Sequence, residues 1–155
     1  MASGAGAVSL HPVFGHTDLQ ASLSRALAMG SLPPSLLIHG PRGVGKQRLA
    51  LWLGQLLLCP ESRPEGPCGE CKGCRMAVNL EHPDLHWYFP LAKPKGVRPA
   101  KLAEALEKAR YDTIAERKAR PLRPASAPAE PTGLYLAVAQ TLRSHANRRP
   151  AVGLR

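Results

Sequence analysis

The chain has 155 residues, of which 44% are hydrophobic and 5% aromatic, enough for one domain with its own core. No apolar run approaches the roughly 18 residues that a membrane span requires, and the first residues do not form a signal peptide, so we expect a soluble, cytoplasmic protein. The net charge of +10 divides into +1 for residues 1–90 and +9 for residues 91–155. A basic second half favours nucleic acid, an acidic partner subunit or a merely solvated basic surface.

The first predicted element is a helix over residues 18–28, where Leu19, Leu23 and Leu27 recur at helical spacing. Gly30 suits the position after its last turn, and Leu32-Pro33-Pro34 prevents it from continuing. A short strand is expected next, from Ser35 to His39, so the helix should pack ahead of that strand.

A glycine loop with the pattern G-x-x-x-x-G-K joins this strand to a second predicted helix that ends near residue 58. Backbone N–H groups, a helix N-terminus and one lysine are what a β- or γ-phosphate needs. The helix should seat on a parallel sheet through Leu49, Trp52, Leu53 and Leu56. The candidate nucleotide-binding residues are Gly40, Pro41, Arg42, Gly43, Val44, Gly45, Lys46 and Gln47.

Gln47 departs from this pattern, because a P-loop has Ser or Thr there to ligate Mg²⁺. Binding of nucleotide is therefore more credible than hydrolysis. The alternative is a glycine-rich turn with a chance lysine.

Four cysteines follow with the spacing C-x8-C-x2-C-x2-C, namely Cys59, Cys68, Cys71 and Cys74. Four thiolates complete the tetrahedral shell of Zn²⁺, so the expected metal is structural and has no open position for catalysis. Disulfides are the rival interpretation, and the lack of an export signal favours zinc.

The rest of the chain alternates short elements with breaks. A brief helix over 75–80 leads to His82-Pro83-Asp84, predicted to be a turn rather than further metal ligands, and then to a second strand over 85–89. A helix is expected from residue 102 to about residue 120, followed by a proline-rich linker over 121–131. Another helix begins near residue 133 and is closed by Pro150.

The order of Val13-Phe14-Gly15-His16, a helix and the glycine loop resembles the opening of AAA+ ATPases of the clamp-loader family. In that family the segment before the helix helps enclose the adenine, so Val13 and Phe14 are candidates for a base pocket, with plain core packing as the alternative. The cysteine module followed by His82-Pro83-Asp84 narrows the resemblance to the delta prime family of bacterial DNA polymerase III. The related tau/gamma subunits usually keep the Ser or Thr that Gln47 replaces.

The resemblance implies an α/β fold, a P-loop NTPase (AAA+ RecA-like) parallel sheet of which residues 1–155 are the N-terminal half. This incomplete domain would include a zinc module at 59–74 and a basic, proline-rich insertion at 91–131, which departs from the family pattern. Implied partners are the delta and tau/gamma clamp-loader subunits, the sliding clamp and primed DNA. Weak binding of ATP or ADP is implied, in a non-catalytic or weakly hydrolysing subunit of the polymerase holoenzyme.

Two other functions are alternatives to a clamp-loader subunit. One is an active ATPase of the tau/gamma type or another P-loop ATPase, against which Gln47 argues. The other is a nucleic-acid-binding protein that is stabilised by zinc and in which the glycine loop has no role. No arrangement of catalytic acid, base or nucleophile is recognisable in the sequence.

Overall fold

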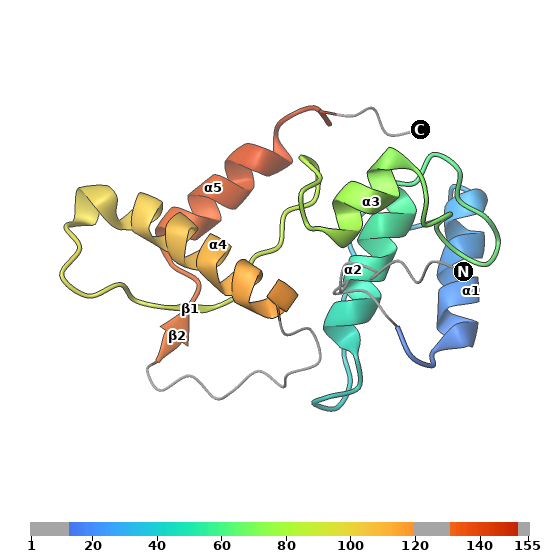
Figure 1. Cartoon of the computed structure of the whole chain (residues 1–155), viewed down its shortest axis with the longest axis horizontal. Coiled ribbons are helices and arrows are strands. Elements are labelled where there is room, and N and C mark those ends of the chain that lie inside the picture. Colours follow the sequence, from blue (N-terminus) through green and yellow to red (C-terminus); the bar gives the residue numbers. More distant parts are fainter. Residues whose placement is uncertain (1–12, 120–130, 152–155) are drawn as a thin grey trace, which may run out of the picture. The chain divides into compact units, whose positions relative to one another are not determined.

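The computed structural model describes residues 13–119 and 131–151, which form two compact units (Figure 1). Unit 1 runs up to Leu85 and includes Ala151, and it holds the helices α1, α2 and α3. Unit 2, His86–Pro150, holds β1, η1, α4, β2 and α5. The glycine loop and all four cysteines belong to unit 1.

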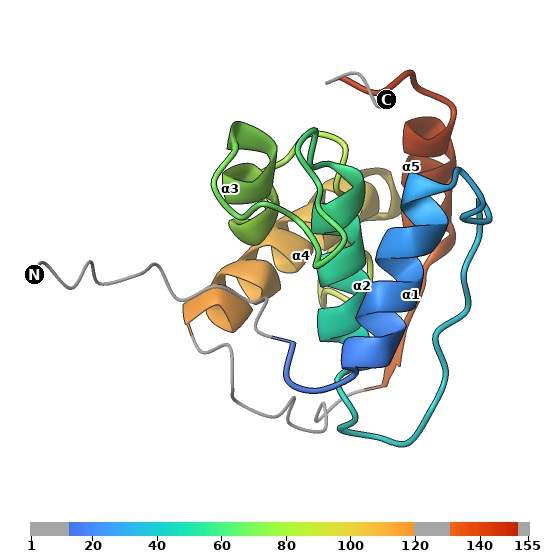
Figure 2. The ribbon, with the colours of Figure 1, turned by 90° about the vertical axis from the view of Figure 1, so that its right-hand side faces the viewer.

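Unit 1 is built on two packed helices, α1 (Thr17–Ala28) and α2 (Lys46–Leu57), which Figure 2 shows side by side. The four α2 residues predicted to be buried do form a core: Leu49, Trp52, Leu53 and Leu56. They pack against α1 and the segments that flank it rather than against a sheet. The partly buried residues on this core are Val13, Leu23, Leu27, Leu32 and Ile38.

The described residues contain no parallel sheet, which corrects that part of the expected fold. The segment over 35–39 is not a strand, and Leu37 is 89% exposed. Residues 85–89 are likewise outside any strand. The physical reason is that a strand is defined by backbone hydrogen bonds to a neighbour, and neither segment finds one among the described residues.

Helix α3 (Lys72–Val78) lies against the end of α2. Its N-cap is Cys71, whose Sγ accepts a hydrogen bond from the backbone N–H of Cys74. A Cβ at Gly73 would lie 2.5 Å from the carbonyl oxygen of Leu58, so only glycine permits this approach. The helix therefore carries the last cysteine directly to the end of α2.

Unit 2 is organised around α4 (Leu102–Ala119), which continues from the 3-10 turn η1 (Pro99–Lys101), and α5 (Leu136–Ala146). A two-residue antiparallel pair, β1 (Leu91–Ala92) with β2 (Thr132–Gly133), joins its start to its second half. Its buried residues are Phe89, Leu91, Leu106, Arg110, Ile114 and Val138. The expected linker over 121–131 lies outside the described residues except for Pro131. Among the described helices, none is long and apolar enough to cross a membrane.

Candidate nucleotide and metal sites

The glycine loop turns through three glycines with positive φ before α2 begins. Gly40, Gly43 and Gly45 have φ values of 146°, 87° and 91°. No atom lies within 4 Å of a Cβ built at Gly43 or Gly45, so what requires glycine there is backbone conformation rather than crowding. The loop is thus shaped by its glycines as the motif predicts.

The N-terminus of α2 is open to an anion. Gly45 is the N-cap and makes no side-chain capping bond, and the first turn carries no acidic residue. Uncapped N–H groups at a helix start are donors for phosphate oxygens. The Lys46 ammonium donates to the carbonyl oxygens of Gly40, at 2.8 Å, and Pro41, at 2.7 Å. Lysine and helix N-terminus therefore lie on the same loop.

His16 is a contact of the loop that sequence reasoning missed. Its Nε2 lies 2.8 Å from the Val44 carbonyl oxygen and donates to it, which ties the start of α1 to the loop. The backbone of His16 is left-handed, with φ 56°. The turn before α1 therefore fixes the direction from which the His16 side chain reaches the loop. Of the two base-pocket candidates, Val13 packs on the α2 core, whereas Phe14 is 77% exposed.

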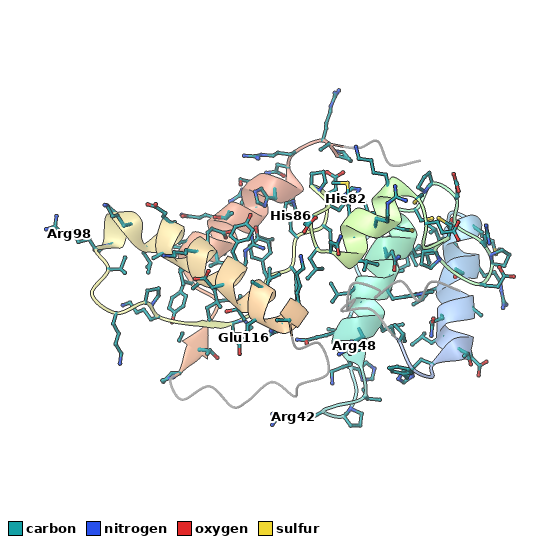
Figure 3. The ribbon with its side chains drawn as sticks, in the orientation of Figure 1. Arg42, Arg48, His82, His86, Arg98 and Glu116 are labelled. Atoms are coloured by element: carbon teal, nitrogen blue, oxygen red, sulfur yellow. The ribbon has the colours of Figure 1, made fainter. Side chains whose placement is uncertain are left out.

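The remaining charged and polar candidates are Arg42 and Gln47, and Arg48, which was not a candidate, follows them in the first turn of α2. Figure 3 shows Arg42 at the tip of the loop and Arg48 in the first turn of the helix. Gln47 is exposed. Its side chain makes no hydrogen bond within the described part of the chain.

The four cysteines come together at the far end of α2. Their sulfur atoms all lie within 4.8 Å of one another, with Cys68 to Cys74 at 3.9 Å and Cys59 to Cys71 at 4.0 Å. Thiolates about 2.3 Å from a tetrahedral Zn²⁺ are separated by about 3.8 Å, so the separations of 3.9 and 4.0 Å are close to those of a zinc site. The thiols are free rather than paired in disulfides.

Backbone N–H groups point at three of these sulfurs. The N–H groups of Cys68, Cys71 and Cys74 donate to the Sγ atoms of Cys59, Cys68 and Cys71, over 3.3 to 3.4 Å. The backbone N–H of Cys71 leads the causes that lower the pKa of the Cys68 thiol to about 7, whereas burial raises the pKa values of Cys59 and Cys74. Buried thiols of this kind need a cation to become thiolates, which suits a metal site.

His82-Pro83-Asp84 forms the expected turn and is separate from the cysteine cluster. The buried His82 accepts the backbone N–H of Asp84 at Nδ1, over 3.2 Å. Asp84 in turn accepts the backbone N–H of Ala151 at Oδ1, over 2.7 Å. Sequence reasoning missed this contact, which links residues 67 positions apart.

A glycine loop with the G-x-x-x-x-G-K pattern at the start of α2 and a cysteine cluster at its end define the class of this protein: a mostly helical domain with an adjoining four-cysteine module. Residues 15–121 match the family described as DNA polymerase III, delta subunit, and the chain belongs to that family. The predicted delta prime resemblance is confirmed. The match includes residues 91–121 of the expected insertion.

The individual relatives are also subunits of DNA polymerase III. The chain is 38% identical over 66 residues to DNA polymerase III subunit delta' of Pseudomonas aeruginosa and 37% identical over 62 residues to that of Escherichia coli K12. It is 35% identical over 63 residues to DNA polymerase III subunit tau of Escherichia coli K12. These matches cover 43%, 40% and 41% of this chain but only 19%, 18% and 10% of the relatives. No solved structure matches significantly.

Proposed function

We propose that this chain is part of a clamp-loader subunit of the delta prime type, which helps to place the sliding clamp on primed DNA during replication. The observation that supports it most is the family match over residues 15–121, which spans both the glycine loop and the cysteine cluster. The partners would be the delta and tau/gamma subunits, the sliding clamp and, through the complex, DNA. Such a protein would work in the cytoplasm.

The proposal extends to the fold of the whole domain. Residues 1–155 would be the N-terminal half of an AAA+ domain, in which 35–39 and 85–89 become strands of a parallel sheet once neighbouring strands satisfy their backbones. The segment 91–131 would be an insertion into that domain. Leu37, exposed here, would then be covered by the sheet's neighbours.

In this role the glycine loop would bind nucleotide weakly. The N–H groups at the start of α2 and Lys46 would hold the phosphates, while Gln47 offers no hydroxyl for Mg²⁺. The loop would therefore contribute to assembly of the clamp loader more than to hydrolysis of ATP.

The four cysteines would hold a structural Zn²⁺, which supplies charge neutralisation and folding energy rather than catalysis. Protein purified without chelator should carry about one zinc per chain by elemental analysis. Zinc-free protein with an intact cysteine cluster would contradict the assignment.

The alternative is a tau/gamma-type or other P-loop ATPase, and the similarity to subunit tau favours it. The deciding experiment uses the complete parent protein. With delta and tau/gamma subunits of the same organism, it should restore loading of the clamp on primed DNA, and alone it should not hydrolyse ATP. Turnover by the isolated protein at the roughly 1 to 100 per second of competent phosphoryl-transfer enzymes would favour the alternative.

A further inference from the structure

Unit 2 carries most of the charge of the chain. Residues 86–150 contain 13 Lys or Arg and 5 Asp or Glu, a net +8 out of +10. Several of the cations are exposed at the end of α5, among them Arg143, Arg148 and Arg149. Such a field raises the local concentration of polyanions.

Two arginines of α4, two helical turns apart, lie over the aromatic segment that opens unit 2. The guanidinium carbon of Arg110 lies 4.9 Å from the ring centre of Tyr88. That of Arg117 lies 4.9 Å from Trp87 and 4.4 Å from Phe89. Both arginines therefore use their flat faces against rings.

The hydrogen bonds of the two arginines differ. Arg110 donates twice to Glu107 Oε2, at 3.0 and 2.7 Å, and once to the Trp87 carbonyl oxygen, at 3.3 Å. Arg117 has no hydrogen-bond acceptor within residues 13–119 and 131–151. None of its nitrogens is fully buried without a partner, because within these ranges Ser24 Oγ is the only such side-chain atom. Arg117 therefore keeps N–H groups that no described residue accepts.

Arg117 has also lost part of its hydration. Burial lowers the pKa of its guanidinium, an effect that the neighbouring Glu116, labelled in Figure 3, opposes. A partly dehydrated guanidinium gives up less water when an anion binds. Its fork of donors matches two oxygens of one phosphate group.

We propose that Arg117, held over Trp87 and Phe89, is a phosphate-binding residue through which unit 2 docks single-stranded nucleic acid. The exposed cations of unit 2 supply long-range attraction. Tyr111 of α4, 63% exposed with Arg110 4.8 Å from its ring centre, adds a surface on which a base can stack. An acidic protein would be attracted by the same cations but has no base to stack on the Tyr111 ring, so nucleic acid fits this surface better. The proposal concerns unit 2 alone and goes beyond the role in clamp loading.

The test compares Arg117→Met with Lys108→Met in the full chain. Both changes remove one positive charge from α4, but Lys108 is exposed and has no cation–π contact within the described residues. Binding of a labelled oligo(dT) is followed by fluorescence anisotropy over a salt series. Arg117→Met should weaken binding about tenfold and reduce the salt slope by about 0.7, whereas Lys108→Met should have a clearly smaller effect on affinity. Equal losses of affinity for oligo(dT) in the two variants would overturn the proposal of a specific site at Arg117.

Thermal unfolding separates binding from packing. Methionine keeps the apolar stem on the rings but loses the cation–π contacts with Trp87 and Phe89, so Arg117→Met should lower the Tm only slightly. Arg110→Met should lower the Tm more, because Glu107 and the Trp87 carbonyl lose their donor. A lower Tm with unchanged binding in Arg117→Met would make Arg117 a packing residue and overturn the proposal. Wild-type binding to poly-glutamate but not to oligo(dT) would also overturn it.

Discussion

Gln47 is the residue on which the proposed balance between nucleotide binding and hydrolysis depends. Gln47→Thr would restore the hydroxyl that P-loops use for Mg²⁺, so affinity for ATP should rise about fivefold when Mg²⁺ is present, as measured by titration calorimetry. In excess chelator the same variant should bind ATP no more tightly than the wild type. Lys46→Ala should lose affinity in both conditions, and an equal gain with and without Mg²⁺ would rule out a metal ligand.

Ser24 shows what a single buried polar atom contributes to α1. Its Oγ is buried without a hydrogen-bond partner in the described chain, so the hydroxyl lost water without compensation. Ser24→Ala should raise the free energy of unfolding by about 1 kcal/mol relative to Ser22→Ala. Ser22 is exposed on the same helix, so this control cancels the difference in helix propensity. Urea unfolding in which Ser24→Ala is the less stable variant would show that Oγ has a partner in solution.

At the scale of the element, the contact between α3 and the end of α2 depends on one glycine. Gly73→Ala would place its Cβ 2.5 Å from a backbone oxygen, which cannot retreat easily. We expect a loss of about 1 to 3 kcal/mol in the free energy of unfolding. Gly54→Ala is the matched control, since its Cβ meets only the end of the Leu85 side chain, at 2.9 Å, and helix propensity favours alanine. Equal stability of the two variants would contradict the close approach.

Helix α3 should also depend on the zinc ion that we propose for the cysteine cluster. It has only seven residues, too short to be stable alone, and it starts within the cysteine cluster. Removal of zinc with a strong chelator should therefore expose the α3 amides to hydrogen exchange while those of α4 stay protected. Structural zinc contributes on the order of 10 kcal/mol, so the effect should be large. Protection of α3 that survives complete zinc removal would show that packing on α2 is sufficient.

At the scale of the whole molecule, the two ends of unit 1 that flank residues 86–150 lie close together. The hydrogen bond from Ala151 to Asp84 joins the two ends of unit 1 that flank residues 86–150. Replacing 86–150 by a short Gly-Ser linker should therefore leave the zinc content unchanged, as measured by elemental analysis. Binding of oligo(dT) should be lost, because unit 2 carries the +8 charge and Arg117. Loss of zinc after excision would show that unit 1 needs unit 2 to fold.

Sequence alone determined the local features, since these depend on residue type and spacing. Helical periodicity placed α1 and α2 to within a few residues, and the Glu104–Lys108 spacing did the same for α4. The four buried positions of α2 followed from the same periodicity. The spacing of the cysteines predicted their cluster because C-x2-C turns bring sulfurs together locally. The family followed from motifs that are short and contiguous.

Tertiary structure decided what depends on neighbours distant in the sequence. Whether 35–39 is a strand depends on a partner backbone, and the apolar run Leu36-Leu37-Ile38 carries no information about that partner. The contacts of His16 with Val44 and of Asp84 with Ala151 arise only when the chain folds back. Likewise, Arg110 and Arg117 look alike in sequence, and only packing gives Arg110 a carboxylate while Arg117 contacts rings without an acceptor among the described residues.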